Sequence, residues 1–506
     1  MSASILKTFS PFKKPLKILF VSAEVAPYVL VGGLGQVMKS LPASLRKLRV
    51  DARIFMPKYA LIDEKKYPME IIFQDLKVPT DSPEKEELVC NVKRHVPGEP
   101  EAPAYFLENM EYYEKRANVY GYSDDPVRFA LLCRGALEFL RKSDWIPDII
   151  NATDWHTGFL PDYLKTKYSQ DRKLSKIITV FSIHNLFHQG IFDHRTIPEL
   201  DFDDGKSEIA PFFSDRIAKQ NFMKRGIIYS DVVNTVSENY SKEILTKDYG
   251  EGLDELLKEM RTKIFGILNG IDYNELNPAT DKLIPFNFSL AELKRKMKNK
   301  IHLQKEFNLE ASQDIPLLGM VTRLFEQKGV DLLFPIMEIL LSDFDLELVI
   351  VGEGEAKYRD FFFEMAKKFP KRFSFHPVSD FTLGRRVLAG CDIFLMPSKF
   401  EPCGLTQMEA MRYGAVPIVR KTGGLADTVE DFDPRKKSGT GFVFEKFDST
   451  ALFGTTIRAI ETFKHKNVWQ DLVRRVMKTD FSWEISAQKY LELYRKAISF
   501  KSFSRL

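Results

Sequence analysis

Two cations lie on a short loop that suits the binding of a diphosphate. Arg323 and Lys328 follow the apolar run Leu317–Val321, which predicts a buried strand, so both belong to a loop at a strand's carboxyl end. Arginine offers a planar fork of donors and lysine a compact charge, and together they fit a pyrophosphate group. The alternative is that both are ordinary surface cations among the 74 lysines and arginines of the chain.

A carboxylate lies on a second turn of the same kind. Glu401 stands between two prolines, after the apolar run Ile393–Met396 and before a predicted helix that opens at Gly404. A carboxylate held this rigidly can bind sugar hydroxyls or balance positive charge that develops on a sugar ring. The other interpretation is a partner for the helix dipole. Cys403 is interpreted as a small packing residue rather than a nucleophile, because no histidine lies near it in the sequence.

Two glycine pairs, far apart in the chain, are candidate phosphate cradles. Gly32 and Gly33 follow a predicted strand and turn, and Thr422, Gly423 and Gly424 lie near the other end of the chain. Glycine lets the backbone approach a ligand closely, and a following helix presents unpaired N–H groups. Two half-sites so far apart in sequence indicate one ligand held between two domains.

Two histidine clusters also follow predicted strands. His156 comes after Ile149–Ile150, and His184 and Asn185 come after Ile177–Phe181. Neither cluster has the carboxylates and spacing of a metal site, and the G-x-S-x-G turn of a serine hydrolase is missing. Neutral imidazoles and the Asn185 amide fit hydrogen bonding to sugar hydroxyls better. For His156, a buried structural histidine is the alternative.

The composition is that of a globular protein with two large domains. The chain has 506 residues, of which 44% are hydrophobic and 28% charged. A net charge of +4 argues against bulk binding of nucleic acid and permits a local basic pocket. Four scattered cysteines predict neither a disulfide framework nor a zinc site. Without an apolar run long enough to span a bilayer, the sequence predicts a cytoplasmic protein with no membrane partner.

Short β-rich runs alternate with amphipathic segments in two series of about 200 residues each. This alternation predicts α/β domains with doubly wound parallel sheets, which bind ligands at the carboxyl ends of their strands. Residues 277–288 contain two prolines and no clear periodicity, so they are expected to begin the interdomain link. Residues 293–305 predict a lysine-rich helix with a solvated face.

The ordered motifs resemble the bacterial glycogen synthase and plant starch synthase family, retaining glucosyltransferases that use ADP-glucose. The similarity extends from about Leu16 to Tyr494 and rests on seven strings in the order of the family. The strings are Ser22–Pro27, Asp154–Gly158, His184–Leu186, Ile267–Asp272, Arg323–Gly329, Pro397–Gln407 and Thr422–Val429.

The resemblance implies GT-B architecture, in which two facing Rossmann-like domains enclose an active-site cleft. The implied divisions are an N-terminal extension (1–15), an acceptor-side domain (16–280), a nucleotide-sugar-binding domain (281–478) and a C-terminal helix that crosses back to the first domain (479–506). The implied activity is transfer of glucose from ADP-glucose to the non-reducing 4-OH of an α-1,4-glucan such as glycogen, with retention of configuration. From the small net charge and the lack of metal-ligand spacing, we expect no cofactor, no metal and no nucleic-acid partner.

The resemblance also implies a role for each matching residue. Arg323 and Lys328 bind the diphosphate, Glu401 faces the transferred glucose, and His184 lies against the anomeric centre, where its main-chain carbonyl stabilises the sugar cation. The remaining positions are implied to bind substrate: Gly32, Gly33, His156, Asn185, Asn269, Cys403, Gly404, Leu405, Thr422, Gly423 and Gly424.

The first loop departs from the family pattern. Leu30 stands where the family has the lysine of Lys-x-Gly-Gly-Leu, and Gln36 stands where it usually has aspartate. Ser379 takes a place where many members carry an aromatic beside the adenine, and Phe381 is a possible substitute. These changes leave the donor base open and keep two alternatives: a related glucosyltransferase with another donor or a small acceptor, and a catalytically weak glucan-binding protein.

Overall fold

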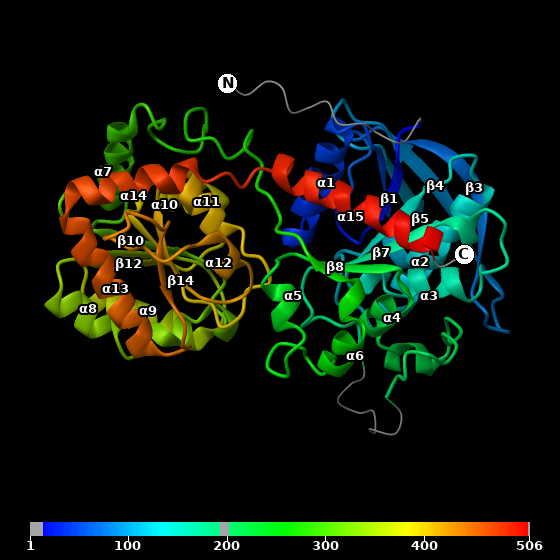
Figure 1. Cartoon of the computed structure of the whole chain (residues 1–506). Helices are drawn as coiled ribbons and strands as arrows, with labels where there is room; N and C mark the ends of the chain where they lie inside the picture. The colour runs from blue at the N-terminus through cyan, green and yellow to red at the C-terminus, as the bar shows by residue number, and fades with distance from the viewer. Residues whose placement is uncertain (1–13, 193–201, 504–506) are drawn as a thin grey trace. The chain divides into compact units, whose positions relative to one another are not determined.

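The computed structural model describes residues 14–192 and 202–503, which form two compact units (Figure 1). Unit 1 comprises the chain up to Thr235, Ile244–Ile267 and the residues from Ser486 onward. Unit 2 comprises Val236–Glu243 and Leu268–Ile485. Of the expected N-terminal extension, residues 1–13 lie outside the described part of the chain.

Unit 1 is built on a nine-stranded sheet with the order β3-β4-β5-β2-β1-β6-β7-β8-β9. The pairs from β5 to β9 in this order are parallel, whereas β4 runs antiparallel to both β3 and β5. The strands are β1 (Lys17–Val21), β2 (Asp51–Pro57), β3 (Glu70–Pro79), β4 (Glu87–His95), β5 (Ala104–Glu108), β6 (Ile149–Thr153), β7 (Ile178–Ile183), β8 (Val232–Thr235) and β9 (Ile264–Gly266). The helices are α1 (Gly33–Lys47), α2 (Asp125–Lys142), α3 (Phe159–Lys165), α4 (Phe222–Tyr229), α6 (Asp254–Glu259) and α15 (Trp483–Phe503), which begins in unit 2.

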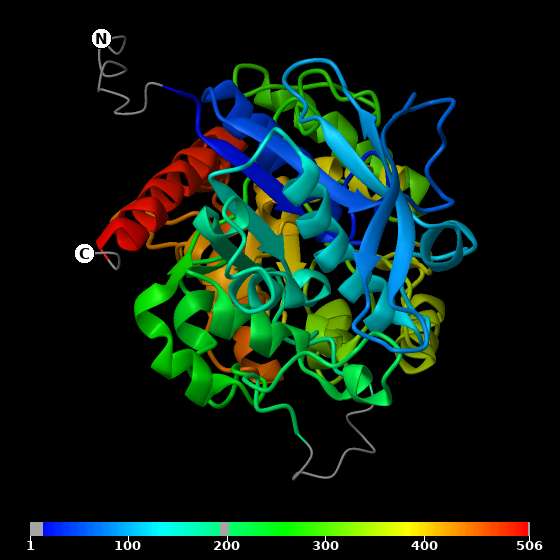
Figure 2. The ribbon, with the colours of Figure 1, turned by 90° about the vertical axis from the view of Figure 1, so that its right-hand side faces the viewer.

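The last helix lies along the sheet of unit 1 (Figures 1 and 2). The Tyr494 hydroxyl donates a hydrogen bond to Asn151 Oδ1 on β6 at 2.8 Å, and the Asn234 amide on β8 donates to the Tyr490 hydroxyl at 3.1 Å. These four side chains are buried, so the helix contributes to the core of unit 1 although it is distant in sequence.

Unit 2 contains a six-stranded, fully parallel sheet with the order β12-β11-β10-β13-β14-β15. Its strands are β10 (Leu317–Val321), β11 (Glu347–Val351), β12 (Phe373–His376), β13 (Ile393–Met396), β14 (Val416–Arg420) and β15 (Phe442–Phe444). Its helices are α5 (Tyr240–Glu243), α7 (Lys296–Glu306), α8 (Met337–Asp343), α9 (Ala356–Lys368), α10 (Phe381–Gly390), α11 (Thr406–Arg412), α12 (Gly423–Thr428), α13 (Ser449–Lys464) and α14 (Lys466–Lys478).

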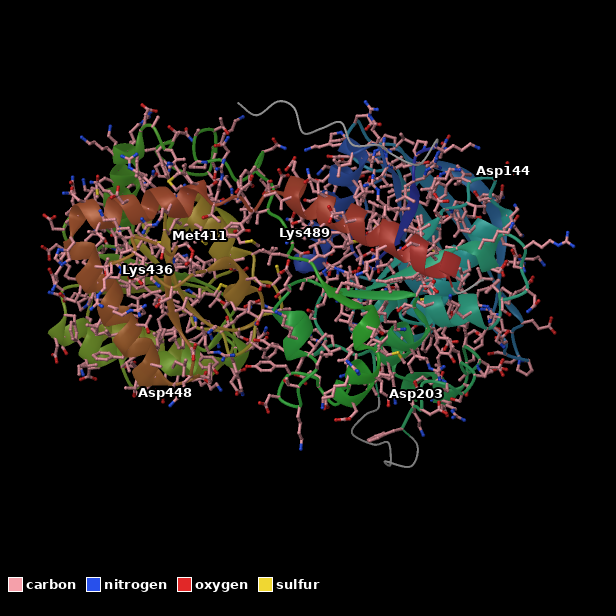
Figure 3. All side chains as sticks on the ribbon, viewed as in Figure 1. Asp144, Asp203, Met411, Lys436, Asp448 and Lys489 are labelled. Atoms are coloured by element: carbon pink, nitrogen blue, oxygen red, sulfur yellow. The ribbon has the colours of Figure 1, made fainter. Side chains whose placement is uncertain are left out.

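The parallel sheet of unit 2 and the largely parallel sheet of unit 1 confirm the predicted fold class. The central strands are uninterrupted apolar runs because helices cover both faces, as in β13, where all four residues are buried. In contrast to the buried strands, the surface and the first residues of the helices carry polar side chains. Figure 3 shows Asp448 at the edge of unit 2; its side chain caps α13 by accepting from two amides, whereas Met411 of α11 is fully buried.

Two local expectations from the sequence differ from the structure. Residues 277–288 pack within unit 2 rather than forming a free link, because Ile284 and Phe288 belong to its core and Asp281 accepts hydrogen bonds from Arg385 and Tyr413. The helix in residues 293–305 does not present all its lysines to solvent. Lys296 and Lys300 are buried, so the prediction of a simple solvated lysine face was wrong.

Candidate functional site

The loop after β10 places Arg323 and Lys328 at the carboxyl edge of the unit 2 sheet. Gly329 ends this loop with a φ of 68°, and a side chain there would approach the Pro397 carbonyl oxygen to 2.1 Å. Only glycine therefore allows the β10 loop to pack directly against the loop after β13. Arg323 is exposed, and in the described part of the chain it has no ion pair, its one ring contact being Phe325.

Lys328 reaches across to the β13 loop and pairs with Glu401. Its Nζ lies 2.7 Å from Glu401 Oε2, which also accepts a hydrogen bond from the Ser398 hydroxyl at 3.1 Å. Both side chains are largely buried, with 15% of Lys328 and 9% of Glu401 exposed. The sequence separates them by 73 residues, so only the parallel arrangement of β10 and β13 brings the cation and the carboxylate together.

The backbone after Glu401 turns sharply to begin α11. Gly404 has a φ of 67°, and its carbonyl accepts a hydrogen bond from the buried Gln407 side chain at 2.9 Å. Burial raises the pKa of the Cys403 thiol to about 12, so this cysteine stays protonated and packs as an apolar residue. Asn269 hydrogen-bonds the Cys403 sulfur, and its buried Oδ1 has no hydrogen-bond partner among the described residues. Leu405 is partly buried against the core.

The second glycine pair packs against the turn that carries Glu401. The Gly424 amide donates to the Glu401 carbonyl at 3.1 Å, and a Cβ on Gly423 would lie 1.9 Å from the same oxygen. The amide of Gly423 donates to both carboxylate oxygens of Glu243, at 2.9 and 3.0 Å, and Thr422 Oγ1 donates to Glu243 as well. In this structure the expected phosphate cradle is therefore filled by a carboxylate of the protein itself.

Two contiguous pockets lie above the unit 2 sheet. The smaller, about 210 Å³, is lined by Arg323, Lys328 and Ser398 at the ends of β10 and β13. The larger, about 310 Å³, also includes Arg323. It is further lined by Thr322, Gly352, Glu353, Ser379, Phe381, Arg385, Thr406 and Glu409. Arg323 therefore stands where the two pockets meet.

The first glycine loop, in unit 1, is likewise occupied by a carboxylate. Glu24 Oε2 accepts hydrogen bonds from the amides of Val31 and Gly32 at 2.8 and 2.9 Å, and its other oxygen accepts from the Tyr120 hydroxyl. Gly33 begins α1, and no side chain caps this helix. Leu30, which replaces the family lysine, is 53% exposed. Glu24 had no assigned role in the sequence analysis, because its contacts depend on how the loop folds back.

An aspartate positions the backbone of His184. Asp154 has a left-handed backbone with a φ of 53°, and its Oδ1 accepts hydrogen bonds from the amides of His184 at 2.7 Å and Asn185 at 3.4 Å. Burial raises the pKa of Asp154 to about 7, although the two amides oppose this rise. The Asn185 side-chain oxygen accepts from the Phe187 amide and so helps to shape the turn.

The two histidines that the sequence singled out are neutral and have unsatisfied ring nitrogens. Burial lowers the pKa of His184 to about 4 and the pKa of His156 well below its usual value. His156 lies between aromatic rings, with Tyr120 stacked at 4.9 Å and Trp155 at 4.0 Å. Within the described part of the chain, His156 Nδ1 and His184 Nε2 are buried without a hydrogen-bond partner. Such atoms are usual where a ligand completes the hydrogen bonding.

Two kinds of feature are missing from the residues that the structure describes. Within residues 14–192 and 202–503, no three histidine, cysteine, aspartate or glutamate side chains are grouped closely enough to hold a metal ion. In the same part of the chain, no helix has the length and apolar character needed to cross a membrane.

Comparison with known proteins identifies the family. Residues 17–259 match the family described as the starch synthase catalytic domain, and residues 303–473 match the family described as glycosyl transferases group 1. The glycogen synthases of Thermosipho melanesiensis and Fervidobacterium nodosum are 40% and 41% identical to this chain. Each alignment covers 96% of this chain and 99% of the relative.

Solved structures agree with the sequence relatives. The catalytic domain of starch synthase IV from Arabidopsis thaliana, solved bound to ADP and acarbose, is 32% identical, with a TM-score of 0.82. That match covers 96% of this chain and all of the solved one. Sucrose-phosphate synthase from Thermosynechococcus elongatus, at 16% identity and a TM-score of 0.58, shares the fold. This chain therefore belongs to the glycogen synthase and starch synthase family of retaining glycosyltransferases.

Proposed function

We propose that this glycogen synthase uses ADP-glucose and extends the non-reducing 4-OH end of an α-1,4-glucan with retention of configuration. The observation that carries the proposal is the Lys328–Glu401 pair, at 2.7 Å, beside Arg323 in adjoining pockets. A cation and a carboxylate at one strand edge match the two needs of the reaction, which are a stabilised diphosphate and a stabilised sugar cation.

The nucleotide is assigned to the two pockets of unit 2. The smaller pocket takes the diphosphate, because Arg323 and Lys328 both line it. The larger takes the nucleoside, with the exposed Phe381 ring available for stacking and the Glu353 carboxylate for hydroxyl groups. Binding of ADP by starch synthase IV, the solved relative at 32% identity, supports this assignment.

The chemistry assigned to the site is substitution on one face of the sugar. The bond from the anomeric carbon to the diphosphate breaks and a bond to the acceptor oxygen forms on the same face, while the acceptor's proton passes to the leaving phosphate. Arg323 and Lys328 stabilise the negative charge that grows on the diphosphate. Glu401 and the main-chain carbonyl of His184 stabilise the sugar cation, and the hydrogen bond from the His184 amide to Asp154 holds that segment in place.

The acceptor is assigned to the histidine cluster of unit 1. His156 and His184 are neutral, and each has a buried ring nitrogen that needs a partner. Neutral imidazoles exchange hydrogen bonds with sugar hydroxyls without the cost of burying a charge. Binding of acarbose by the solved starch synthase IV supports a carbohydrate ligand in the family.

One observation favours two other candidates. The first is a weakly catalytic glucan-binding protein, and the second is a transferase that uses another donor. Leu30 places an exposed apolar side chain at the first glycine loop, where the family lysine would offer a charge. The glucan-binding protein would differ from the synthase in turnover, and the other transferase would differ in its preferred donor. Activity measurements with two donors therefore separate them.

The direct test is release of nucleoside diphosphate by the purified protein, incubated with glycogen and either ADP-glucose or UDP-glucose. We expect release that depends on glycogen and is faster with ADP-glucose. Faster release with UDP-glucose would overturn the donor assignment. Binding of glycogen without release from either donor would replace the enzyme by the glucan-binding candidate.

A further inference from the structure

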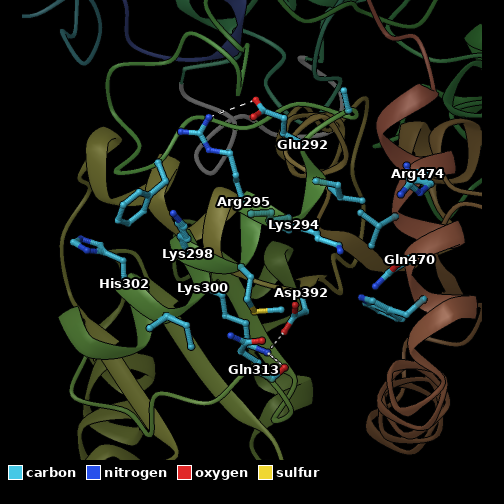
Figure 4. A pocket seen from close by; sticks show the side chains of 18 of the residues that line it. Glu292, Lys294, Arg295, Lys298, Lys300, His302, Gln313, Asp392, Gln470 and Arg474 are labelled. Carbon is cyan, nitrogen blue, oxygen red and sulfur yellow. Dashed lines mark hydrogen bonds and ion pairs between the residues drawn. The ribbon is translucent and has the colours of Figure 1, made fainter.

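A large basic cavity lies in unit 2 apart from the donor pockets. It has a volume of about 960 Å³ and lies between α14 and the segment 286–305, which contains a 3₁₀ turn (Leu293–Arg295) and α7 (Figure 4). It shares no lining residue with either donor pocket among the described residues. Its volume is in the range of small-molecule sites, about 300 to 1,000 Å³.

Cations dominate the walls of this cavity. Seven lysines and arginines line it against two acids, Glu292 and Asp392. The seven are Lys294, Arg295, Lys296, Lys298, Lys300, Lys305 and Arg474. The chain as a whole has a net charge of only +4, so this accumulation is local.

Three of the seven cations have partners within the protein. Lys300 pairs with Asp392 at 2.7 Å, and Arg295 lies 3.4 Å from Glu292. Lys296 donates to the carbonyls of Ala389 and Cys391, at the end of α10. Those carbonyls are the negative end of a helix dipole, so the buried Lys296 charge is structural.

The other cations are exposed and free to bind an anion. Within the described part of the chain, Lys294 and Arg474 have no ion pair or hydrogen bond from their side chains, and Lys298 makes only a ring contact with Phe286, at 5.9 Å. Figure 4 shows Arg474 on the α14 side of the cavity and Lys294 and Lys298 on the opposite side. Positive charges on two opposite walls can contact one bound ligand from both sides. Gln313 and Gln470 add amide groups suited to hydroxyls.

We propose that this basic cavity is a binding site for a phosphate-bearing small molecule, a phosphorylated sugar or a nucleotide. A phosphate group provides the negative charge that can pair with the positive charges of Lys294 and Arg474. The planar guanidinium of Arg474 can bind it with two donors. A neutral glucan would leave these charges unmatched, and a lone inorganic phosphate would leave most of the volume and both glutamines unused. The cavity is therefore matched to a charged group with an organic body.

The test is calorimetric titration of the full-length protein at low ionic strength, where charge pairing is least screened. The probes are glucose 1-phosphate, AMP, inorganic phosphate and neutral maltotetraose. The diagnostic pair is Lys294→Glu with Arg474→Glu. Its matched control is Lys282→Glu with Lys478→Glu, which makes the same change of charge at exposed lysines that do not line the cavity. Arg323→Ala identifies any binding that occurs in the donor pockets.

We expect glucose 1-phosphate or AMP to bind. Comparison of their affinities shows whether the site prefers a sugar phosphate or a nucleotide. The diagnostic pair should weaken that binding tenfold or more, whereas the control pair and Arg323→Ala should leave it within twofold. If the charge-reversed pair does not fold, the neutral pair Lys294→Gln with Arg474→Gln should still weaken binding.

Several results would overturn the proposal. They are no binding of either organic phosphate, binding no tighter than that of inorganic phosphate or maltotetraose, loss of binding in Arg323→Ala alone, and equal weakening by the control pair. The last of these would mean attraction by net charge only. The measurement needs no turnover, so its outcome is independent of the proposed catalytic function.

Discussion

At the residue scale, Arg323 and Lys328 differ in a way that separates catalysis from stability. Arg323 is exposed, whereas Lys328 is paired with the largely buried Glu401. We expect Arg323→Ala to lower kcat/KM by two or more orders of magnitude, about 3 kcal/mol of transition-state stabilisation, with an unchanged midpoint of urea unfolding. Lys328→Ala should cost as much activity and also about 1–3 kcal/mol of stability, because Glu401 loses its partner.

The control for this pair is Arg359→Ala, which removes an exposed arginine on α9 that lines neither donor pocket. It should keep both parental activity and parental stability. Near-parental rates in both Arg323→Ala and Lys328→Ala would show that the diphosphate is bound elsewhere.

The departures in the first loop lead to a second prediction. The structure keeps the glycine loop closed by Glu24 although Leu30 and Gln36 differ from the family, so the missing lysine affects ligand contacts rather than architecture. Leu30→Lys with Gln36→Asp should raise kcat/KM for ADP-glucose about tenfold, and more than either single change, because each new charge supplies a partner for the other. A double variant slower than the parent would mean that this loop serves a different donor geometry.

The neutral histidines lead to a prediction about pH. The folded protein keeps His156 unprotonated, whereas the unfolded chain takes up a proton below about pH 6.5, so stability decreases as the pH falls through this value. Asp154 acts in the opposite sense, because its raised pKa favours the folded state as it takes up a proton below about pH 7.

Comparison of two chains isolates the histidine contribution. Between pH 6.5 and 5.5, His156→Gln should lose about 1 kcal/mol less stability than the parent, as measured by urea unfolding at each pH. An identical pH dependence in the two proteins would show that His156 takes up its proton equally in the folded and unfolded states, so that folding does not lower its pKa.

The sequence was sufficient to propose candidate residues for the site but not to predict their partners. Arg323, Lys328, Glu401 and the histidines were recognisable by type and by their position after apolar runs. Glu24 and Glu243 were missed as partners of the glycine amides, because no spacing rule links a carboxylate to an amide 180 residues away, as in the contact of Glu243 with Gly423.

At the element scale, the close packing of two loops holds Glu401 in place. A Cβ on Gly423 would lie 1.9 Å from the Glu401 carbonyl, and the residue has a φ of 44°. Gly423→Ala should therefore lower stability by about 1–3 kcal/mol and also reduce kcat, since the Glu401 turn must shift.

The matched control for that change is Gly454→Ala in the middle of α13. A Cβ at this position meets no atom within 4 Å, so alanine should stabilise the protein by about 0.5–1 kcal/mol and leave activity unchanged. Thermal unfolding and steady-state rates of both variants measure the contrast. Equal effects of the two substitutions would contradict the account of loop packing.

The elements that the sequence predicted best are the buried parallel strands. β10 and β13 have the bounds expected from their apolar runs. The hairpin of β3 and β4 was missed because its strands are only partly buried and mix apolar residues with polar and charged ones, so they form no uninterrupted apolar run. The buried lysines of α7 were missed for a different reason: both donate to main-chain carbonyls, which no side-chain pattern reveals, and Lys300 also pairs with the distant Asp392.

At the scale of the whole molecule, each unit brings its own set of reactive groups to the carboxyl ends of its strands. Unit 1 provides neutral histidines and unit 2 provides cations with a carboxylate. Because the cations of unit 2 neutralise the diphosphate in this account, turnover should survive an excess of EDTA. The assay is ADP release with and without chelator. Complete loss that is restored by a divalent ion would contradict the account of leaving-group stabilisation.

Transfer of glucose from ADP-glucose to the end of an α-1,4-glucan can be tested by following the glucose itself. Purified protein is incubated with glycogen and ADP-glucose labelled in the glucose, and the polymer is then isolated and digested with β-amylase, which removes maltose from non-reducing α-1,4 ends. We expect label in the polymer in proportion to the ADP released, and recovery of that label as maltose. Release of ADP with the label recovered as free glucose, or label that β-amylase cannot remove, would contradict it.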